Sequence, residues 1–376
     1  MDPSTQIDLV RRVLAHVETR TTDHAAMPTT RAVAAYVDAE RHEREVQALF
    51  RGLPVAIAHR SALAAPGDFV THDANGRPLL VVRGDDGVLR AFLNVCRHRG
   101  TRLEQAPCGK KKAFTCPYHA WTYAKDGALL AVPHEAAFGH VDHAARSLAP
   151  VHVVEALGFV WLAPAGADVT GFAGETLARD LDGFGVTASF SHAPRTMTRA
   201  LNWKLALDVF LEAYHLRTTH RDSIYPMFFD NLGLVDRFGP HLRNVFPKRT
   251  IRELASQAPE SWQLRRHANV LFHLFPNTLV LVQPDHAAVL HLWPDGPART
   301  ILTAYTLVPE LPATDKARAY WDANNAILYA AVEEDFAMGE SIQRGLASGA
   351  NTELVFGAFE HALDHFHSTV DRLVGA

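Results

Sequence analysis

Two short stretches, Cys96-Arg97-His98 and Cys116-Pro117-Tyr118-His119, determine what the N-terminal half of this chain folds around. Each stretch carries one thiol and one imidazole close together. Their neighbours suit loops that wrap around a buried group, because Gly100 allows a tight turn and Pro117 stiffens the second loop. Thiolates and imidazoles are ligands for soft and borderline metals, so the arrangement predicts a metal centre held by two loops.

The ligand set favours an iron–sulfur cluster over zinc. Iron–sulfur clusters are usually bound by four thiolates, but in a Rieske [2Fe–2S] centre two His replace two Cys on one iron. We therefore expect Cys96 and Cys116 to bind one iron, and His98 and His119 to bind the other. The same four side chains would suit tetrahedral zinc. Zinc fingers, however, place both Cys on one knuckle and both His on another, whereas here each loop carries one of each.

The flanking residues narrow the type of cluster. Residues 94–100 and 116–121 resemble the ligand loops of Rieske proteins. Members of the respiratory type carry one more Cys in each loop, joined as a disulfide, whereas this chain has Thr101 and Tyr118 at those positions. Cys108 matches neither position, and we interpret it as a spare, partly buried thiol. The missing disulfide favours the oxygenase branch of Rieske proteins.

The composition is that of a globular protein. The chain has 376 residues, 48% apolar and 21% charged, with a net charge of −4, and this length allows two packed units. The charge argues against a nucleic-acid binder. No run approaches the 18 or so apolar residues of a membrane span, and Met1-Asp2-Pro3-Ser4 lacks a signal-peptide layout. Three Cys fit no disulfide framework, so we expect a reducing, cytoplasmic location.

The pattern of apolar and turn-forming residues divides the chain into three parts and predicts an α+β fold. Residues 5–22 and 31–51 have helical periodicity, and from about residue 53 short β-like runs alternate with Asn-Gly and Asp-Gly pairs, a strong hairpin signal. These pairs are Asn75-Gly76, Asp86-Gly87 and Asp126-Gly127. We predict N-terminal helices over 1–49 that pack on the C-terminal part, an all-β unit over 50–163, and a mixed part over 164–376.

The mixed part is expected to combine a sheet with long helices. A loose segment over 163–185 leads into it, and a helix is predicted over 202–218. Runs at 269–283, 287–293 and 299–308, with short turns between them, predict antiparallel strands. Two helices over 313–347 and 352–373 end the chain.

A second group of potential ligands lies on the predicted helix over 202–218. Glu212 and His215 are three residues apart and would share a helix face, and His220 is placed where the helix ends. Two His and one carboxylate form the facial triad of non-haem Fe(II) oxygenases. The chain has 22 His, so solvated or core His is the alternative interpretation, but a redox cluster upstream needs something to reduce.

Together these motifs resemble the terminal oxygenase (alpha) subunit of Rieske non-haem iron oxygenases, also called ring-hydroxylating oxygenases. The resemblance covers residues 35–165 and 198–221, and more weakly 333–345. It implies that the all-β part is a Rieske [2Fe–2S] domain. It further implies that the mixed part is a helix-grip (START/Bet v1-like) catalytic domain with an antiparallel sheet and long C-terminal helices.

The resemblance also implies the ligands of a mononuclear iron. In the family two His of such a helix bind the iron, here His215 and His220, and the third ligand is an Asp on a late helix. Glu333-Glu334-Asp335, followed by Gln343-Arg344-Gly345, is similar to that segment. Asp335 is therefore the expected ligand and Glu334 the fallback, and a solvated acidic helix face is the alternative.

Glu212 matches the carboxylate that links the two metal centres in the family. By resemblance it accepts one hydrogen bond from His215 and another from His119 of a neighbouring subunit. A carboxylate between two imidazoles fixes their tautomers. The link implies a ring of subunits, expected to be a homotrimer, with added beta subunits in some members. Val209 departs from the family, which often has Asn there.

The implied activity is O₂-dependent hydroxylation, by mono- or dioxygenation or oxidative dealkylation, of a small aromatic or heteroaromatic compound. The expected cofactors are the cluster and Fe(II). The chain has no Gly-x-Gly-x-x-Gly nucleotide motif, so electrons from NAD(P)H are expected to arrive through a separate reductase, possibly with a ferredoxin. The basic run Lys110-Lys111-Lys112 is either a docking surface for that acidic donor or a solvated run.

Alternative functions remain open from the sequence. The Glu at position 212 also fits a monooxygenase or N-demethylase of quaternary ammonium or N-methyl compounds. A pure electron-transfer protein without catalytic iron, or a ligand-binding domain with an inert cluster, would not bring His215, His220 and Asp335 together.

Overall fold

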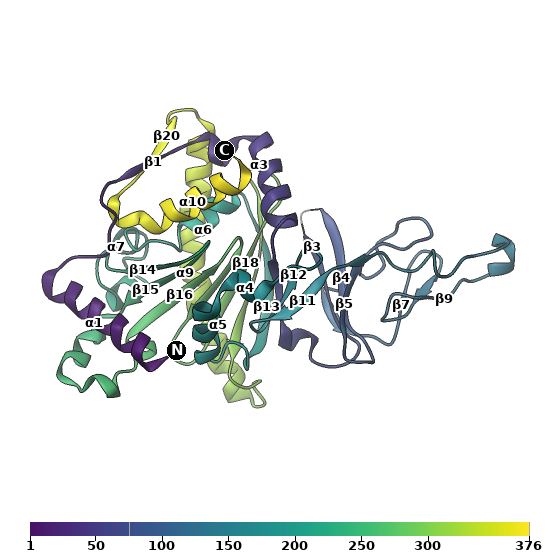
Figure 1. Cartoon of the computed structure of the whole chain (residues 1–376), viewed down its shortest axis with the longest axis horizontal. Coiled ribbons are helices and arrows are strands. Elements are labelled where there is room, and N and C mark those ends of the chain that lie inside the picture. Colours follow the sequence, from purple (N-terminus) through teal and green to yellow (C-terminus); the bar gives the residue numbers. More distant parts are fainter. Residues whose placement is uncertain (75, 376) are drawn as a thin grey trace. The chain divides into compact units, whose positions relative to one another are not determined.

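The computed structural model describes residues 1–74 and 76–375 (Figure 1). It divides into two compact units, one formed by Leu53–Val169 and the other by Met1–Gly52 together with Thr170–Ala376. The predicted N-terminal and C-terminal parts thus lie in one unit, and α1 (Pro3–Thr19) packs against α8 (Leu264–His267) and β14 (Leu234–Phe238). Among the described residues, no helix is both long and apolar enough to cross a membrane.

The smaller unit is built from antiparallel strands. A five-stranded sheet has the order β10-β5-β4-β3-β6, and two three-stranded sheets have the orders β11-β12-β2 and β7-β8-β9. The strands are β2 (Val55–His59), β3 (Asp68–Ala74), β4 (Arg77–Arg83), β5 (Leu89–Leu93), β6 (Cys108–Lys110), β7 (Phe114–Thr115), β8 (Thr122–Tyr123), β9 (Leu129–Ala131), β10 (Pro150–Val151), β11 (Val153–Ala156) and β12 (Phe159–Leu162). Asn75 of the predicted Asn75-Gly76 turn lies outside the described residues.

The larger unit is built on a seven-stranded antiparallel sheet of order β13-β19-β18-β17-β16-β15-β14. Besides β14, the strands are β13 (Phe190–Arg199), β15 (His241–Pro247), β16 (Ala268–Leu274), β17 (Thr278–Val282), β18 (Ala287–Pro294) and β19 (Thr300–Val308). Every residue of β18 is buried, as expected for a strand covered on both faces. The 33-residue helix α9 (Asp315–Ala347) crosses the sheet (Figure 1). The predicted α+β fold with an antiparallel sheet and long C-terminal helices is confirmed.

Several predicted helices are interrupted. The segment 31–51 contains part of β1 (Thr29–Ala32), then α2 (Ala34–Val37), α3 (Ala39–Glu45) and a π-helix over Val46–Arg51. The predicted helix over 352–373 begins instead as β20 (Glu353–Phe356), which pairs with β1, and becomes α-helical only in α10 (His361–Val374). Strand pairing between the two ends of the chain overrides helical periodicity in both places. The segment 163–185, expected to be loose, contains α4 (Val169–Ala173) and α5 (Glu175–Gly183).

The single helix predicted over 202–218 is wrong. The Asn202 side chain caps α6 (Trp203–Asp208) by accepting from the Lys204 amide, but the helix stops at Asp208 and only α7 (Leu216–Thr219) follows. Between the two helices, the Glu212 carboxylate accepts hydrogen bonds from the backbone N–H groups of Tyr214 and His215. A side chain that binds local amides in this way competes with the helical hydrogen-bond ladder.

A buried ion pair fixes α6 in the core. Lys204 Nζ lies 2.6 Å from Glu45 Oε2, and the two side chains are 1% and 0% exposed. Trp203 Nε1 donates to the same oxygen at 3.0 Å, and Arg41 Nε lies 3.0 Å from Oε1. Burial lowers the pKa of Lys204, and the Glu45 carboxylate opposes this effect. The pair therefore ties α3 to α6 only while both partners are present.

We expect Glu45→Gln to lower the free energy of unfolding by about 3–5 kcal/mol, because it leaves the Lys204 ammonium buried without a countercharge. The measurement is urea unfolding followed by circular dichroism. The double variant Glu45→Gln, Lys204→Met should recover much of the loss. Arg299→Ala, which removes the exposed pair with Asp295, serves as the control and should cost less than about 1 kcal/mol. Equal losses in both single variants would contradict this prediction.

Candidate metal centres and substrate pocket

The two cluster loops have the same backbone conformation. Cys96 N donates to Thr101 O and Gly100 N to Cys96 O; in the second loop, Cys116 N donates to Trp121 O and Ala120 N to Cys116 O. Gly100 and Ala120 both have positive φ, 83° and 57°. Each loop therefore turns through a left-handed residue four positions after its Cys. Glycine suits that conformation in the first loop, and Ala120 adopts it in the second.

The thiols lie inside and the imidazoles outside. Cys96 and Cys116 are 2% and 3% exposed and belong to the core of the smaller unit. His98 is half-buried and His119 is exposed, with their ring centroids 4.8 Å apart. Two buried thiols and two outer imidazoles on paired loops fit a Rieske cluster, in which two thiolates bind one iron and two imidazoles bind the other. Cys108 is exposed, so its predicted partial burial is wrong.

Other residues fix the loops where respiratory Rieske proteins have a disulfide. The His98 ring stacks on Trp121 with centroids 4.8 Å apart and planes 7° from parallel. Tyr123 Oη accepts from the Arg97 amide at 2.9 Å and lies 3.5 Å from Cys96 Sγ. Aromatic packing and a hydrogen bond thus position the first loop without any covalent link.

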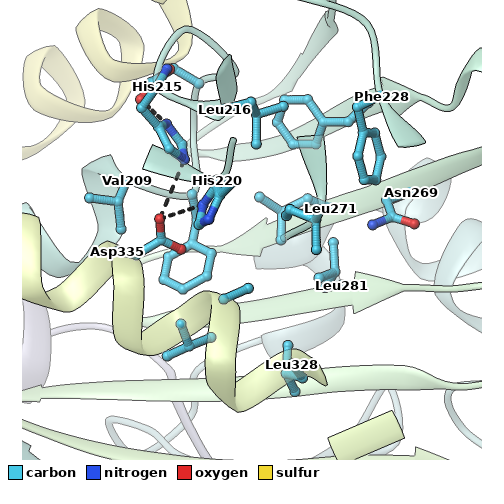
Figure 2. A pocket seen from close by; sticks show the side chains of 16 residues that line it. Val209, His215, Leu216, His220, Phe228, Asn269, Leu271, Leu281, Leu328 and Asp335 are labelled. Carbon is cyan, nitrogen blue, oxygen red and sulfur yellow. Dashed lines mark hydrogen bonds and ion pairs between the residues drawn. The ribbon is translucent and has the colours of Figure 1, made fainter. Parts of the chain in front are cut away.

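The larger unit brings together the three residues expected to bind a mononuclear metal. The ligand atoms of His215, His220 and Asp335 all lie within 4.8 Å of one another. Asp335 Oδ1 is 2.8 Å from His220 Nε2 and 3.4 Å from His215 Nε2 (Figure 2). Two segments far apart in the sequence meet here, because α7 packs against α9.

The donor set fits a divalent iron. Asp335 Oδ1 is buried and has no hydrogen-bond partner among the described residues, although two imidazole nitrogens lie close to it. A buried carboxylate oxygen without a donor is unfavourable unless something else satisfies it. Two imidazoles and one carboxylate on one side of an ion, with other positions open, are the ligands of non-haem Fe(II) oxygenases.

Each imidazole has its own outer carboxylate. His215 Nδ1 contacts Glu212 Oε1, and His220 Nδ1 lies 2.5 Å from Glu334 Oε2, which also accepts from Ser223 Oγ at 2.7 Å. Because a carboxylate only accepts, Nδ1 carries the proton in both rings and the Nε2 lone pairs face Asp335. Glu334, the fallback ligand of the sequence analysis, therefore lies on the outer side of His220, away from the converging ligand atoms.

The carboxylates around His215 and His220 favour positive charge on the two imidazoles. Burial lowers the pKa of His215, but the nearby carboxylates of Asp335 and Glu212 outweigh it and raise the pKa to about 10. Burial also opposes protonation of His220, whose pKa Asp335 and Glu334 nevertheless raise. A site that stabilises a proton on each imidazole is electrostatically suited to a metal cation, which would replace the inner protons.

A largely apolar cavity of roughly 590 Å³, its open mouth included, adjoins these ligands (Figure 2). Its polar lining consists of Glu212, His215, His220, Asp335 and Asn269. Its apolar lining is Val209, Phe210, Leu216, Ile224, Phe228, Phe246, Leu271, Leu281, Leu328, Ala331 and Val332. No Lys or Arg is among the described lining residues. Nothing in the sequence singled out Asn269, one polar residue in a strand.

The predicted basic surface is partly neutralised. Lys111 Nζ is paired with Glu104, and Arg102 Nη1 lies 2.8 Å from Asp73 Oδ2. Exposed pairs of this kind contribute little to stability, but they reduce the excess positive charge of the cluster loops. A docking role for the lysine run therefore stays a prediction.

Comparison with known proteins agrees with this geometry. Residues 187–376 match the family model of the ring hydroxylating alpha subunit (catalytic domain), and residues 54–151 match the Rieske [2Fe-2S] domain. The oxygenase subunit of carnitine monooxygenase from Escherichia coli (strain K12) is 30% identical over 355 residues, 90% of this chain and 92% of that protein.

Two further similarities come from different parts of the family. The large oxygenase component of a naphthalene 1,2-dioxygenase system from Pseudomonas aeruginosa is 35% identical over 196 residues, 50% of this chain and 43% of that protein. The crystal structure of the quaternary ammonium Rieske monooxygenase CntA superposes with a TM-score of 0.79 at 25% identity, covering 92% of this chain and 95% of that one. This chain therefore belongs to the alpha subunits of the Rieske non-haem iron oxygenases.

Proposed function

We propose that this enzyme hydroxylates a small, uncharged and mainly apolar molecule in the cavity beside His215, His220 and Asp335. The observation that carries the proposal is the convergence of the three ligand atoms at the wall of that cavity. When bound, the mononuclear iron supplies the site of O₂ activation and the Rieske cluster supplies electrons. Cys96, His98, Cys116 and His119 would hold the cluster.

The residues of the chain control the geometry around the iron. Glu212 and Glu334 hold the protons of His215 Nδ1 and His220 Nδ1, which keeps both Nε2 lone pairs aimed inward. The apolar wall excludes water from the space next to the ligands, and a dry site strengthens the electrostatic interactions within it. Substrate carbon packed against this wall is thereby held beside the metal ligands.

We further propose that electrons pass between subunits through Glu212. Glu212 Oε1 contacts His215 Nδ1, and the Glu212 side chain is 11% exposed. His119 is exposed at the tip of its loop, so the surface of a neighbouring subunit could reach it. A ring of three subunits would place one such contact at each interface. The structure of one relative is described as giving insight into inter-subunit electron transfer, which supports the proposal.

A separate reductase, with or without a ferredoxin, would deliver electrons from NAD(P)H to the cluster. The sequence has no nucleotide-binding fingerprint of its own. Additional beta subunits are compatible with the proposal but do not carry any part of it.

The pocket lining favours an uncharged substrate. L-carnitine, a substrate of CntA, carries both a quaternary ammonium and a carboxylate. No Lys or Arg lines the described cavity here, and a buried carboxylate without a countercharge is strongly unfavourable. A carboxylate would also be repelled by Asp335 and Glu212.

A quaternary ammonium compound without a carboxylate is the second candidate. Phe210, Phe228 and Phe246 line the cavity, and aromatic faces attract such cations. The carnitine and glycine betaine monooxygenases among the relatives favour it as well. Oxygen consumption and product analysis with choline, L-carnitine and naphthalene would separate the candidates. Preferred turnover of naphthalene supports the first, preferred turnover of choline supports the second, and L-carnitine as the best substrate would contradict both.

Asp335→Ala should abolish binding of the mononuclear iron and leave the cluster intact. The native protein is expected to contain one iron beyond the two of its [2Fe–2S] cluster. Iron and sulfide analysis, together with electron paramagnetic resonance of the reduced cluster, checks both sites. Cys116→Ser is the opposite control, since it should remove the cluster. A protein with only the two cluster irons after careful anaerobic preparation would instead support an electron-transfer function.

Glu334→Gln should weaken Fe(II) binding about 10- to 100-fold, because loss of an outer carboxylate loosens the orientation of the ligand His220. Glu333→Gln is the matched control, since the neighbouring carboxylate pairs with Arg199 outside the site. Iron affinity is measured by competition with a chelator, so turnover is not needed. Equal affinities in the two variants would remove Glu334 from the site.

With Fe(II) supplied in excess so that both metal centres are filled, Glu212→Gln should still slow multiple turnover by about 10- to 100-fold. The amide cannot act as a charged acceptor for both imidazoles, so electron delivery from the cluster becomes limiting. Rapid-mixing measurement of cluster reoxidation in the presence of substrate and O₂ checks this step directly. Normal reoxidation rates in the variant would refute the linking role.

A further inference from the structure

The cavity has two chemically different ends. His215, His220 and Asp335 lie at one end, and Asn269 lies at the other, with Leu271 and Leu281 between them (Figure 2). Apart from the groups around the metal ligands, Asn269 is the one polar residue of the described lining. A substrate that fills the cavity would therefore meet the metal ligands at one end and an amide at the other.

The amide of Asn269 lacks a partner within the fold. Asn269 lies on β16, paired in register with Phe246 of β15. Its Oδ1 is buried and has no hydrogen-bond partner among the described residues. An unpaired amide at this depth weakens the fold, and an apolar side chain such as that of Leu271 would avoid the cost. Packing of the fold alone therefore gives no reason for an amide rather than an apolar side chain at this position.

The orientation of the amide determines which group it would bind. Its nitrogen is turned toward Leu271 and its oxygen is turned away (Figure 2). The N–H groups thus face the space that a substrate would occupy, and they donate only. The matching substrate atom is a hydrogen-bond acceptor, such as a carbonyl or hydroxyl oxygen or a ring nitrogen.

We propose that Asn269 determines substrate specificity by donating a hydrogen bond to an acceptor atom at the end of the substrate remote from the metal ligands. Because the acceptor is anchored there, the opposite end of the molecule is the part presented to the metal ligands. Asn269 therefore also selects the carbon that is hydroxylated. This inference rests on the proposed function for its chemistry, but the binding preference can be tested without turnover.

Three bicyclic probes of similar shape isolate the hydrogen bond. Naphthalene has no polar atom, quinoline adds an acceptor nitrogen, and indole adds a donor N–H. Equilibrium binding to the anaerobic holoenzyme should favour quinoline over naphthalene by about 2- to 12-fold, the range expected for one neutral hydrogen bond. Asn269→Leu should bring this ratio to one. Asn351→Leu, on an exposed loop outside the cavity, should leave the ratio unchanged.

A second substitution reverses the expected preference. Asn269→Asp replaces the donor with an acceptor, so indole should bind better than quinoline. Asn269→Ala provides the deletion if the Leu variant does not fold, as judged by circular dichroism. In coupled turnover, Asn269→Leu should broaden the positions at which quinoline is hydroxylated.

The outcomes separate this inference from the proposed function. No preference for quinoline in the native enzyme, or a preference that survives Asn269→Leu and Asn269→Ala, overturns the role of Asn269. An Asn269-dependent binding preference without hydroxylated product from any probe supports the role of Asn269 and counts against the proposed hydroxylation. Hydroxylation with an unchanged product pattern in the variants overturns the regiochemical part.

Discussion

The buried polar contacts of α6 are the constraint on which the catalytic unit depends. Glu45 neutralises Lys204 at the start of this helix. At its end, Asp208 accepts from Tyr36 Oη at 2.8 Å and lies 2.9 Å from His367 Nε2. Tyr36 and His367 come from the two ends of the chain, so N-terminal and C-terminal segments converge on six residues of helix. Buried charges are tolerated only when every partner is present. The helix α6 is therefore restricted to the one position in which all these contacts form.

The fixed position of α6 also constrains the proposed metal ligands. The chain leaves α6 at Asp208 and reaches Glu212 and His215 within a few residues. This short connection limits how far the His215 imidazole can move relative to α6. Glu212 then binds the local backbone amides and the His215 ring together. The outer carboxylate is thus part of the turn that positions the ligand. Because the Glu212 side chain holds both the backbone turn and the proton on His215 Nδ1, the conformation of the turn and the tautomer of His215 depend on each other.

The proposed cluster ligands could be predicted from the sequence, because their spacing along the chain is short. The Cys and His of the cluster loops lie close together along the chain, and the residues between them specify the turns. Asp335 was assigned by resemblance, because no local pattern distinguishes it from Glu334. Successive helical residues point about 100° apart, so one carboxylate faces His220 Nε2 and the other Nδ1, and only the rotation of α9 decides which. The break after Asp208 could not be predicted from helical periodicity, which does not show that the Glu212 carboxylate binds the amides of Tyr214 and His215.

The residues that α9 contributes to the cavity and to its packing against α6 lie along one face of the helix. Leu328, Ala331 and Val332 line the cavity at the spacing that leads to Asp335. One turn further, a Cβ on Gly339 would come within 2.7 Å of Leu201, and beyond it Gln343 accepts from the Asn202 amide at the start of α6.

The same helix therefore carries the proposed ligand Asp335, forms part of the cavity wall and secures α6, from whose end the chain runs to the other two proposed ligands. A substitution of a cavity-lining residue on α9 that alters the packing of the helix would also move Asp335. Asn269 lies instead on β16, outside α9. A substitution at Asn269 can therefore alter the sheet side of the cavity without changing the packing of α9 against α6, so the cavity wall and the position of Asp335 are separable there.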